Sequence, residues 1–127
     1  MEHLPDPRAT IAAAARVLAP GGLIVLGTAN HDSLARLLRG WWWGYYMPGH
    51  LQYFSANSLS RLLAEEGLPV VRRRFGDDRG LGALRGIRRA TVGRAGILSS
   101  LKDILVRFSV GGFSAGAGMV IYGRKKA

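Results

Sequence analysis

The sequence predicts an α/β fold, because one helix, one sharp turn and one uninterrupted apolar strand follow each other near its beginning. Residues 7–18 place apolar side chains at i, i+3, i+4 and i+7, the stripe of an amphipathic helix. Pro20, Gly21 and Gly22 end that helix and turn the chain. Residues 23–27 follow without polar alternation, which is typical of a strand covered on both faces in a parallel sheet.

The residues before this helix define its start. Asp6 can cap the helix with its carboxylate, and Pro7 suits the first helical position, where no N–H is needed. A helix that leads into a buried strand is the second half of a β–α–β crossover, so another strand should precede it. Only residues 1–4 are available for the end of that strand, so we expect the sheet to lack its beginning.

An aromatic loop, residues 31–54, follows the first strand. In open α/β sheets ligands bind beyond the carboxyl ends of the strands, so this loop is expected to overlook the ligand crevice. Its rings can form the wall or lid of an apolar substrate site, with Trp42, Tyr45 and Tyr53 as candidate contacts. Alternatively, the rings fill the space between the lid and the body of the domain.

The rest of the chain alternates helices and strands. We expect a short helix over 33–38, a helix over 56–66 capped by Ser55, a strand over 69–75, a helix over 96–109 and a last strand over 117–124. In the strand over 69–75, Val71 and Phe75 are expected to be buried. The Arg72–Arg74 run is either an exposed strand end or a phosphate-binding patch.

Residues 76–115 form a basic segment, rich in Gly and Arg, that resembles an insertion before the last strand. Its helix over 96–109 is amphipathic. Such an insertion can rest on an anionic membrane, or it can pack on the sheet or on polypeptide outside the chain.

Composition suits a single domain over residues 1–127, with 48% hydrophobic residues. The absence of cysteine excludes disulfides, thiolate metal sites and thiol nucleophiles. A net charge of +10 favours an anionic partner, which could be a membrane surface, a nucleic acid or an anionic substrate. Alternatively, the charge reflects an Arg-rich proteome or is balanced by acidic residues elsewhere. With no signal-peptide pattern, we expect a cytoplasmic location, or a peripheral one at a membrane.

Four short motifs occur in order along residues 1–75. They are Glu-His-Leu-Pro-Asp-Pro at 2–7, Arg-Val-Leu-Ala-Pro-Gly-Gly at 16–22, Thr-Ala-Asn at 28–30, and His-Leu-Gln-Tyr-Phe-Ser at 50–55 with the Leu-rich helix after it. Together they resemble class I S-adenosylmethionine-dependent methyltransferases of the ubiquinone/menaquinone-biosynthesis and type 11/12 kind. The resemblance implies the C-terminal part of a Rossmann-like sheet whose first four strands are largely missing.

One part of the family pattern is not present. The family binds S-adenosylmethionine mainly through a Gly-rich loop after its first strand and an acidic residue ending the second, and the sequence shows neither. The resemblance therefore implies a part of an enzyme that is inactive alone and needs a missing N-terminal half. An uncovered strand edge could also make the chain self-associate.

The resemblance also points to particular residues. His50 matches a family histidine near the active site, as a substrate contact or general base, while Glu2 and His3 fall on the cofactor side. Glu2, His3 and His50 also resemble part of the set with which small-RNA 2′-O-methyltransferases bind a divalent metal. Such ligands could hold Mg²⁺ or Mn²⁺ against a substrate hydroxyl. Alternatively, His50 is a structural, hydrogen-bonding residue.

Three functions remain open from the sequence. The first is the acceptor-side part of a methyltransferase that acts on a small-molecule or lipid-like acceptor. The second is a non-catalytic basic module that binds anionic membrane or nucleic acid, through Arg72–Arg74 and the arginines over 85–94. The third is an inert fragment with an exposed strand edge.

Overall fold

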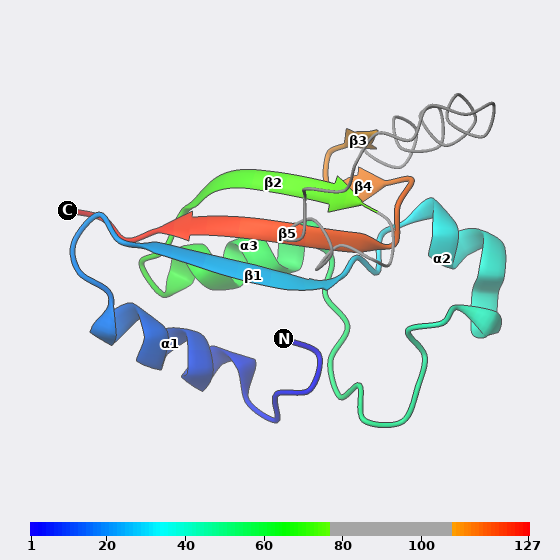
Figure 1. The fold of residues 1–127 in the computed structure, drawn as a ribbon, viewed down its shortest axis with the longest axis horizontal. Coiled ribbons are helices and arrows are strands. Elements are labelled where there is room, and N and C mark those ends of the chain that lie inside the picture. The colour runs from blue at the N-terminus through cyan, green and yellow to red at the C-terminus, as the bar shows by residue number, and fades with distance from the viewer. Residues whose placement is uncertain (77–107) are drawn as a thin grey trace, which may run out of the picture.

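A computed structural model of the chain describes residues 1–76 and 108–127 (Figure 1). The elements are α1 (Pro7–Val17), β1 (Leu23–Ala29), α2 (Leu34–Arg39), the 3-10 helix η1 (Gly40–Trp42), α3 (Ala56–Glu65), β2 (Val70–Gly76), β3 (Ser109–Val110), β4 (Phe113–Ser114) and β5 (Gly118–Arg124). The α/β class is confirmed, and the predicted elements in these ranges are displaced by one or two residues at their ends. The helix expected over 96–109 lies outside the described residues except at its end, where Ser109 belongs to β3 instead.

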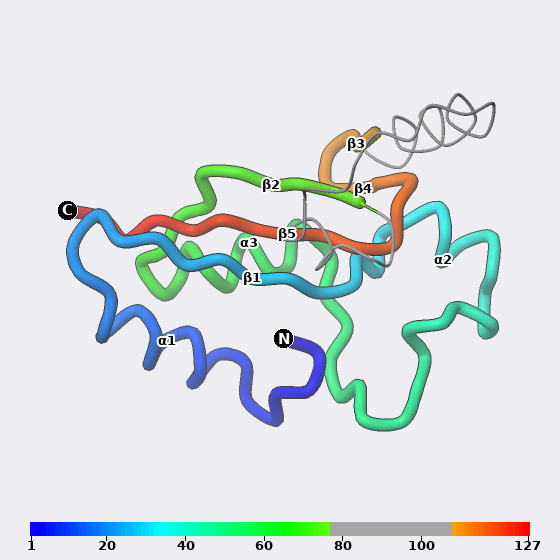
Figure 2. The backbone as a smooth tube through the Cα atoms, viewed as in Figure 1, coloured from blue at the N-terminus to red at the C-terminus, as the bar shows by residue number. Residues whose placement is uncertain are grey.

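Three strands form the main sheet in the order β1-β5-β2, and β5 runs antiparallel to both neighbours. β1 and β2 are therefore parallel to each other, with the last strand between them. β1 pairs with β5 along its whole length, from Leu23 opposite Arg124 to Ala29 opposite Gly118. The other edge of β1 has no strand partner within the described ranges (Figure 2).

One face of the sheet is covered by α1 and α3 (Figure 1). Ile11 of α1 and Leu59 and Leu63 of α3 form one buried cluster with Met119 and Ile121 of β5. These helices therefore hold the sheet through a continuous core, and burial of each large apolar side chain contributes about 1.5–3 kcal/mol.

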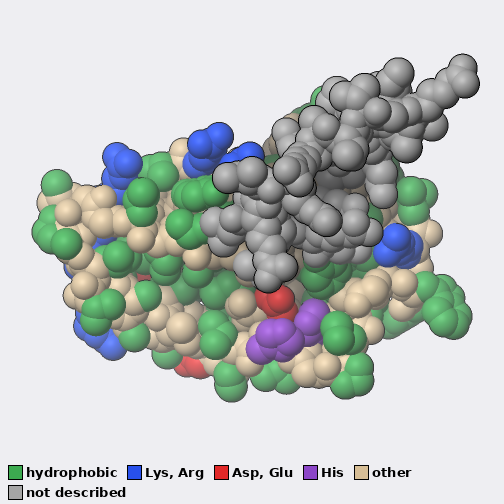
Figure 3. Space-filling model, in the orientation of Figure 1, with side chains coloured by type: hydrophobic (Ala, Val, Ile, Leu, Met, Phe, Trp, Pro, Cys, Tyr) green, Lys and Arg blue, Asp and Glu red, His purple; other side chains and the backbone are tan. Residues whose placement is uncertain are grey.

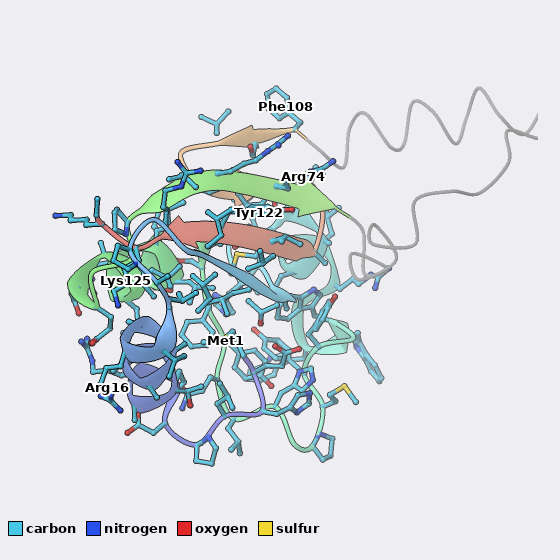
Figure 4. The ribbon with its side chains drawn as sticks, turned by 60° about the vertical axis from the view of Figure 1, so that its left-hand side comes forward. Met1, Arg16, Arg74, Phe108, Tyr122 and Lys125 are labelled. Carbon is cyan, nitrogen blue, oxygen red and sulfur yellow. The ribbon has the colours of Figure 1, made fainter. Side chains whose placement is uncertain are left out.

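The opposite face of the sheet is partly exposed. Leu23 and Val25 of β1 are 49% and 52% exposed, and Val25 lies opposite Tyr122. Tyr122 and Arg74 lie on the side of the sheet away from α1 (Figure 4). The expectation that β1 is covered on both faces is therefore wrong for this structure, because β1 pairs antiparallel and alternates between half-buried and exposed residues.

β2 also differs from expectation at one position. Val71 was expected to be buried but is 54% exposed, whereas Phe75 packs against the core. The register shifts between Val70, opposite Gly123, and Arg72, opposite Tyr122, so Val71 is an extra residue without a partner. Because of this irregularity, Val71 does not follow the expected alternation of buried and exposed side chains along the strand.

Both ends of α1 are held by side chains. The Asp6 carboxylate accepts a hydrogen bond from the Ala9 N–H at 2.9 Å, and Pro7 occupies the first helical position. At the other end, Lys125 Nζ donates to the carbonyl oxygens of Ala15 and Leu18, each at 2.7 Å (Figure 4). The predicted cap is confirmed, and a cation at the helix C-terminus complements the helix dipole.

Candidate functional site at the carboxyl end of β1

Three segments far apart in the sequence meet at the carboxyl end of β1. The carbonyl of Glu2 accepts hydrogen bonds from the N–H groups of Leu51 and, at 3.2 Å, Gln52. A parallel bridge joins Asn30 to Phe54, just beyond β1. The N-terminal segment, the end of β1 and the loop before α3 therefore form one site, at the edge where open α/β sheets bind ligands.

Glu2 is the acidic group of this site. Its Oε2 accepts a hydrogen bond from the Thr28 hydroxyl at 2.7 Å and lies 3.1 Å from the Met1 amino group. Burial alone would raise the pKa of Glu2. The hydrogen bonds from Thr28, the backbone and the amino group outweigh burial, and they lower this pKa from 4.5 to about 2. Glu2 is therefore a carboxylate at any physiological pH.

His3 and His50 meet edge to face, with ring centroids 4.7 Å apart. His3 Nδ1 lies 2.9 Å from the Gly49 carbonyl oxygen, and His50 Nδ1 lies 2.8 Å from that of Tyr45. A carbonyl oxygen only accepts, so in each neutral ring Nδ1 carries the proton and Nε2 carries the lone pair. Neither Nε2 has a hydrogen-bond partner within residues 1–76 and 108–127.

The three side chains form a compact donor set. One ligand atom from each of Glu2, His3 and His50 lies within 4.8 Å of the other two. Figure 3 shows histidine side chains gathered beside acidic ones on the visible face. A carboxylate and two imidazoles are a donor set that suits divalent transition metals, and each imidazole donates its Nδ1–H to a carbonyl as metal-bound histidines do.

An aromatic cluster forms the neighbouring wall. Trp43 is 1% exposed and packs against Tyr45 and Tyr46, with ring centroids 5.1 Å away in both cases. Tyr45 and Tyr53 also approach the His50 ring, at 6.1 and 6.4 Å between centroids. The cluster therefore extends from the core to the histidine pair.

The structure brings together most of the residues predicted from sequence. Glu2, His3 and His50 share one site, and Tyr45 and Tyr53 lie beside it. Trp42 does not join them, because it lies at the end of η1 and is 90% exposed. The loop ring that is buried is its neighbour Trp43.

Asn30 is a structural residue of the site that sequence reasoning did not single out. It is fully buried, and its amide donates to the Gly112 carbonyl at 3.1 Å and the Ser114 hydroxyl at 2.9 Å. Its Oδ1 accepts from the N–H groups of Asp32 and Ala56. The sequence feature that could have identified Asn30 is a polar residue directly after an apolar strand. A polar side chain that is buried there needs hydrogen-bond partners.

The predicted arginine patch is only partly described. Arg72, Arg73 and Arg74 are exposed, and Arg73 donates to the Asn57 side chain at 3.1 Å. The arginines over 85–94 lie outside the described residues. No helix in the described part of the chain is long and apolar enough to cross a membrane.

Comparison with known proteins identifies the class. The methyltransferase-domain family matches the chain over residues 1–73, which is more than half of its length, so the chain belongs to that family. The fold is similar to the crystal structure of a SAM-dependent methyltransferase from Archaeoglobus fulgidus, with a TM-score of 0.56 and 21% sequence identity. That match covers 98% of this chain and 55% of the other. No curated protein matches the chain at a significant level.

These matches confirm the predicted family, a class I methyltransferase. The chain has the fold of part of such an enzyme and spans about half the length of the similar structure.

Proposed function

We propose that the chain supplies the methyl-acceptor side of an S-adenosylmethionine-dependent methyltransferase that acts on a small or lipid-like acceptor. The observation that carries this proposal is the position of His50. Its ring lies at the carboxyl end of β1, between the Glu2–His3 pair and the tyrosine wall, and its Nε2 has no partner in the described ranges.

The chemistry needs little more than alignment. A sulfonium methyl group is already activated, so the main requirement is an acceptor atom held behind the methyl carbon. The rings of Tyr45 and Tyr53 offer apolar walls for the acceptor. His50 Nε2 takes the acceptor proton as a general base, and the Tyr45 carbonyl keeps the imidazole in the tautomer that can do so.

The residues present fit only one side of a cofactor site. Glu2 and His3 offer a carboxylate and an imidazole there, but β1 ends in Ala29 and leads into no glycine-rich loop. We infer that the glycine-rich loop and the acidic strand end belong to polypeptide outside this sequence, either upstream or in a separate subunit. This chain covers only 55% of the similar structure, which supports the inference that part of the enzyme lies outside this sequence.

The test is transfer of a labelled methyl group. The chain, assembled with the polypeptide that carries the glycine-rich loop, is incubated with methyl-labelled S-adenosylmethionine and extracted small-molecule and lipid fractions. We expect His50→Ala to lower the transfer rate roughly 10²–10⁴-fold. His31→Ala, in the same loop but hydrogen-bonded to Tyr46, is the matched control. Transfer by His50→Ala at the wild-type rate would refute the role of His50.

A second role for the same residues follows from the donor set. Glu2, His3 and His50 would hold a divalent metal, which supplies Lewis-acid activation of a substrate hydroxyl. Calorimetric titration with Mn²⁺ tests this role without any substrate. Saturable binding by the wild type that is lost in both Glu2→Gln and His50→Ala supports the metal site. Wild-type heats identical to those of the two variants exclude it.

A basic, non-catalytic module is the other class that the chain permits. The exposed Arg72 and Arg74 on the open sheet face favour it. Binding to RNA that falls steeply with added salt, and that Arg72→Glu/Arg74→Glu abolishes, would support this class over methyl transfer.

A further inference from the structure

Large apolar side chains of α2 and of the following η1 are exposed to solvent. Five of them, three in α2 and two after the turn at Gly40, have more than a third of their surface in water. They are Leu34 at 41%, Leu37 at 56%, Leu38 at 78%, Trp41 at 91% and Trp42 at 90%. Ala35, between them, is the residue that packs inward against the Trp43 cluster. Most of the large apolar surface of this segment therefore lies in water.

This segment, which we call the α2 tip (residues 34–42), protrudes. Figure 2 shows α2 and the following loop extending beyond the end of the sheet, and Figure 3 shows hydrophobic side chains beside a basic one at that end. Gly40 turns the chain there with φ of 51°. The ring of Trp41 contacts that of Tyr46, with ring centroids 6.1 Å apart. Most of the surface of Trp41 nevertheless stays in water.

The charged residues within the tip are both arginines. Between Asp32 and Glu65 the sequence contains no acidic residue, while Arg36 and Arg39 lie in the last turn of α2. Arg36 Nε donates to the His31 carbonyl, which holds that cation close to the tip. Exposed Leu and Trp flanked by Arg are the composition of segments that lie in the interface of an anionic membrane.

We propose that the α2 tip docks the protein on an anionic phospholipid bilayer, with Trp41, Trp42 and Leu38 at the level of the headgroups. A protruding tip suits a deformable lipid surface, and arginine side chains complement phosphate headgroups. This site differs from the basic insertion over 76–115 and from the arginines of β2. It also does not depend on the proposed methyl transfer.

The test measures binding to vesicles of phosphatidylglycerol and phosphatidylcholine by co-sedimentation. We expect Trp41→Ser/Trp42→Ser to weaken binding roughly tenfold or more, with an unchanged thermal melt because neither ring is buried. Val17→Ser is the matched control, since Val17 is 86% exposed but lies on α1. It should bind as the wild type does.

A second measurement separates insertion from simple charge attraction. Bromine-labelled lipids should quench part of the tryptophan emission of the wild type, and this quenching should vanish in Trp41→Phe/Trp42→Phe, which keeps only the buried Trp43. Equal vesicle binding by the wild type and the double Ser variant would overturn the proposal. So would loss of binding only in Arg72→Glu/Arg74→Glu, or a concentration-dependent dimer of the wild type that the double Ser variant lacks.

Discussion

The side-chain amide of Asn30 donates a hydrogen bond to the hydroxyl of Ser114 at 2.9 Å, and both residues are fully buried. This contact ties the end of β1 to the β3–β4 hairpin. Ser114 in turn donates to the Gly116 carbonyl at 2.7 Å. The polar network therefore fixes the backbone at the edge where the candidate site lies.

Loss of the Asn30 amide should be costly. We expect Asn30→Ala to lower the free energy of unfolding by about 2–4 kcal/mol, because it leaves several buried backbone and hydroxyl groups without partners. Urea denaturation measures the change. Asn57→Ala is the control, because Asn57 also bonds a hairpin carbonyl, that of Gly111, but is exposed. A similar small loss in both variants would contradict the buried network.

Glu2 should make stability depend on acid pH. Its folded pKa of about 2 is below the ordinary 4.5, so its carboxylate stabilises the native state fully above about pH 4.5. This contribution is lost as the pH falls from 4.5 through 2. In Glu2→Gln the free energy of unfolding should be lower at neutral pH, and the difference from wild type should shrink toward pH 2.

The matched control for Glu2 is Glu65. Its pKa is also lowered, mainly by the hydrogen bond from Arg8, but the pair is exposed and screened by salt. We expect Glu65→Gln to change acid stability less than Glu2→Gln, and hardly at all in high salt. Untagged protein is needed, because the Met1 amino group pairs with Glu2. Identical pH profiles for wild type and Glu2→Gln would contradict this account.

Trp43 should tolerate loss of its N–H but not of its ring. Its Nε1 is buried without a hydrogen-bond partner among the described residues, so the indole contributes through packing. We expect Trp43→Ala to cost about 3–5 kcal/mol of unfolding free energy and Trp43→Phe well under half of that. Thermal and urea unfolding of both variants checks the order. Equal losses would indicate that the Nε1 has a partner.

The tautomers of His3 and His50 can be observed directly. With Nδ1 facing carbonyl oxygens, the neutral rings should carry their proton on Nδ1. Nitrogen NMR at mildly alkaline pH should show protonated Nδ1 and unprotonated Nε2 in both residues. The Nε2–H tautomer at His50 would remove the lone pair that the proposed base and the proposed metal ligand both need.

Local rules predicted much of the fold. Asp6, Pro7 and Ser55 act at helix starts as their side-chain chemistry requires, and both capping interactions are present. The predicted Ser33–Leu38 helix appears as α2, because Ser33 caps it and Gly40 ends it. Such features depend on residues within one turn of each other, so sequence alone defines them.

Features that depend on distant partners were not predictable. The burial of Asn30 requires Gly112 and Ser114 from the hairpin, and the exposure of Val71 depends on its register against β5. Three consecutive tryptophans look alike in sequence. Only the 3-10 geometry of η1 decides that Trp43 turns inward while its two neighbours stay in water.

The convergence of Glu2, His3 and His50 was anticipated only through the family resemblance. Their spacing in the sequence does not bring them together. The contact is made by the loop before α3, where Leu51 N–H donates to the Glu2 carbonyl at 2.7 Å. The site thus depends on long-range backbone pairing that composition and periodicity do not contain.

Calorimetric titration of S-adenosylmethionine tests most directly whether this chain is the acceptor side of a divided methyltransferase. The 127-residue chain alone should give no saturable heat, and the chain joined to the polypeptide with the glycine-rich loop should bind the cofactor. His50→Ala in the joined protein should bind equally well, since His50 is placed on the acceptor. Saturable binding by the chain alone, or none by the joined protein, would contradict the proposed division of the site.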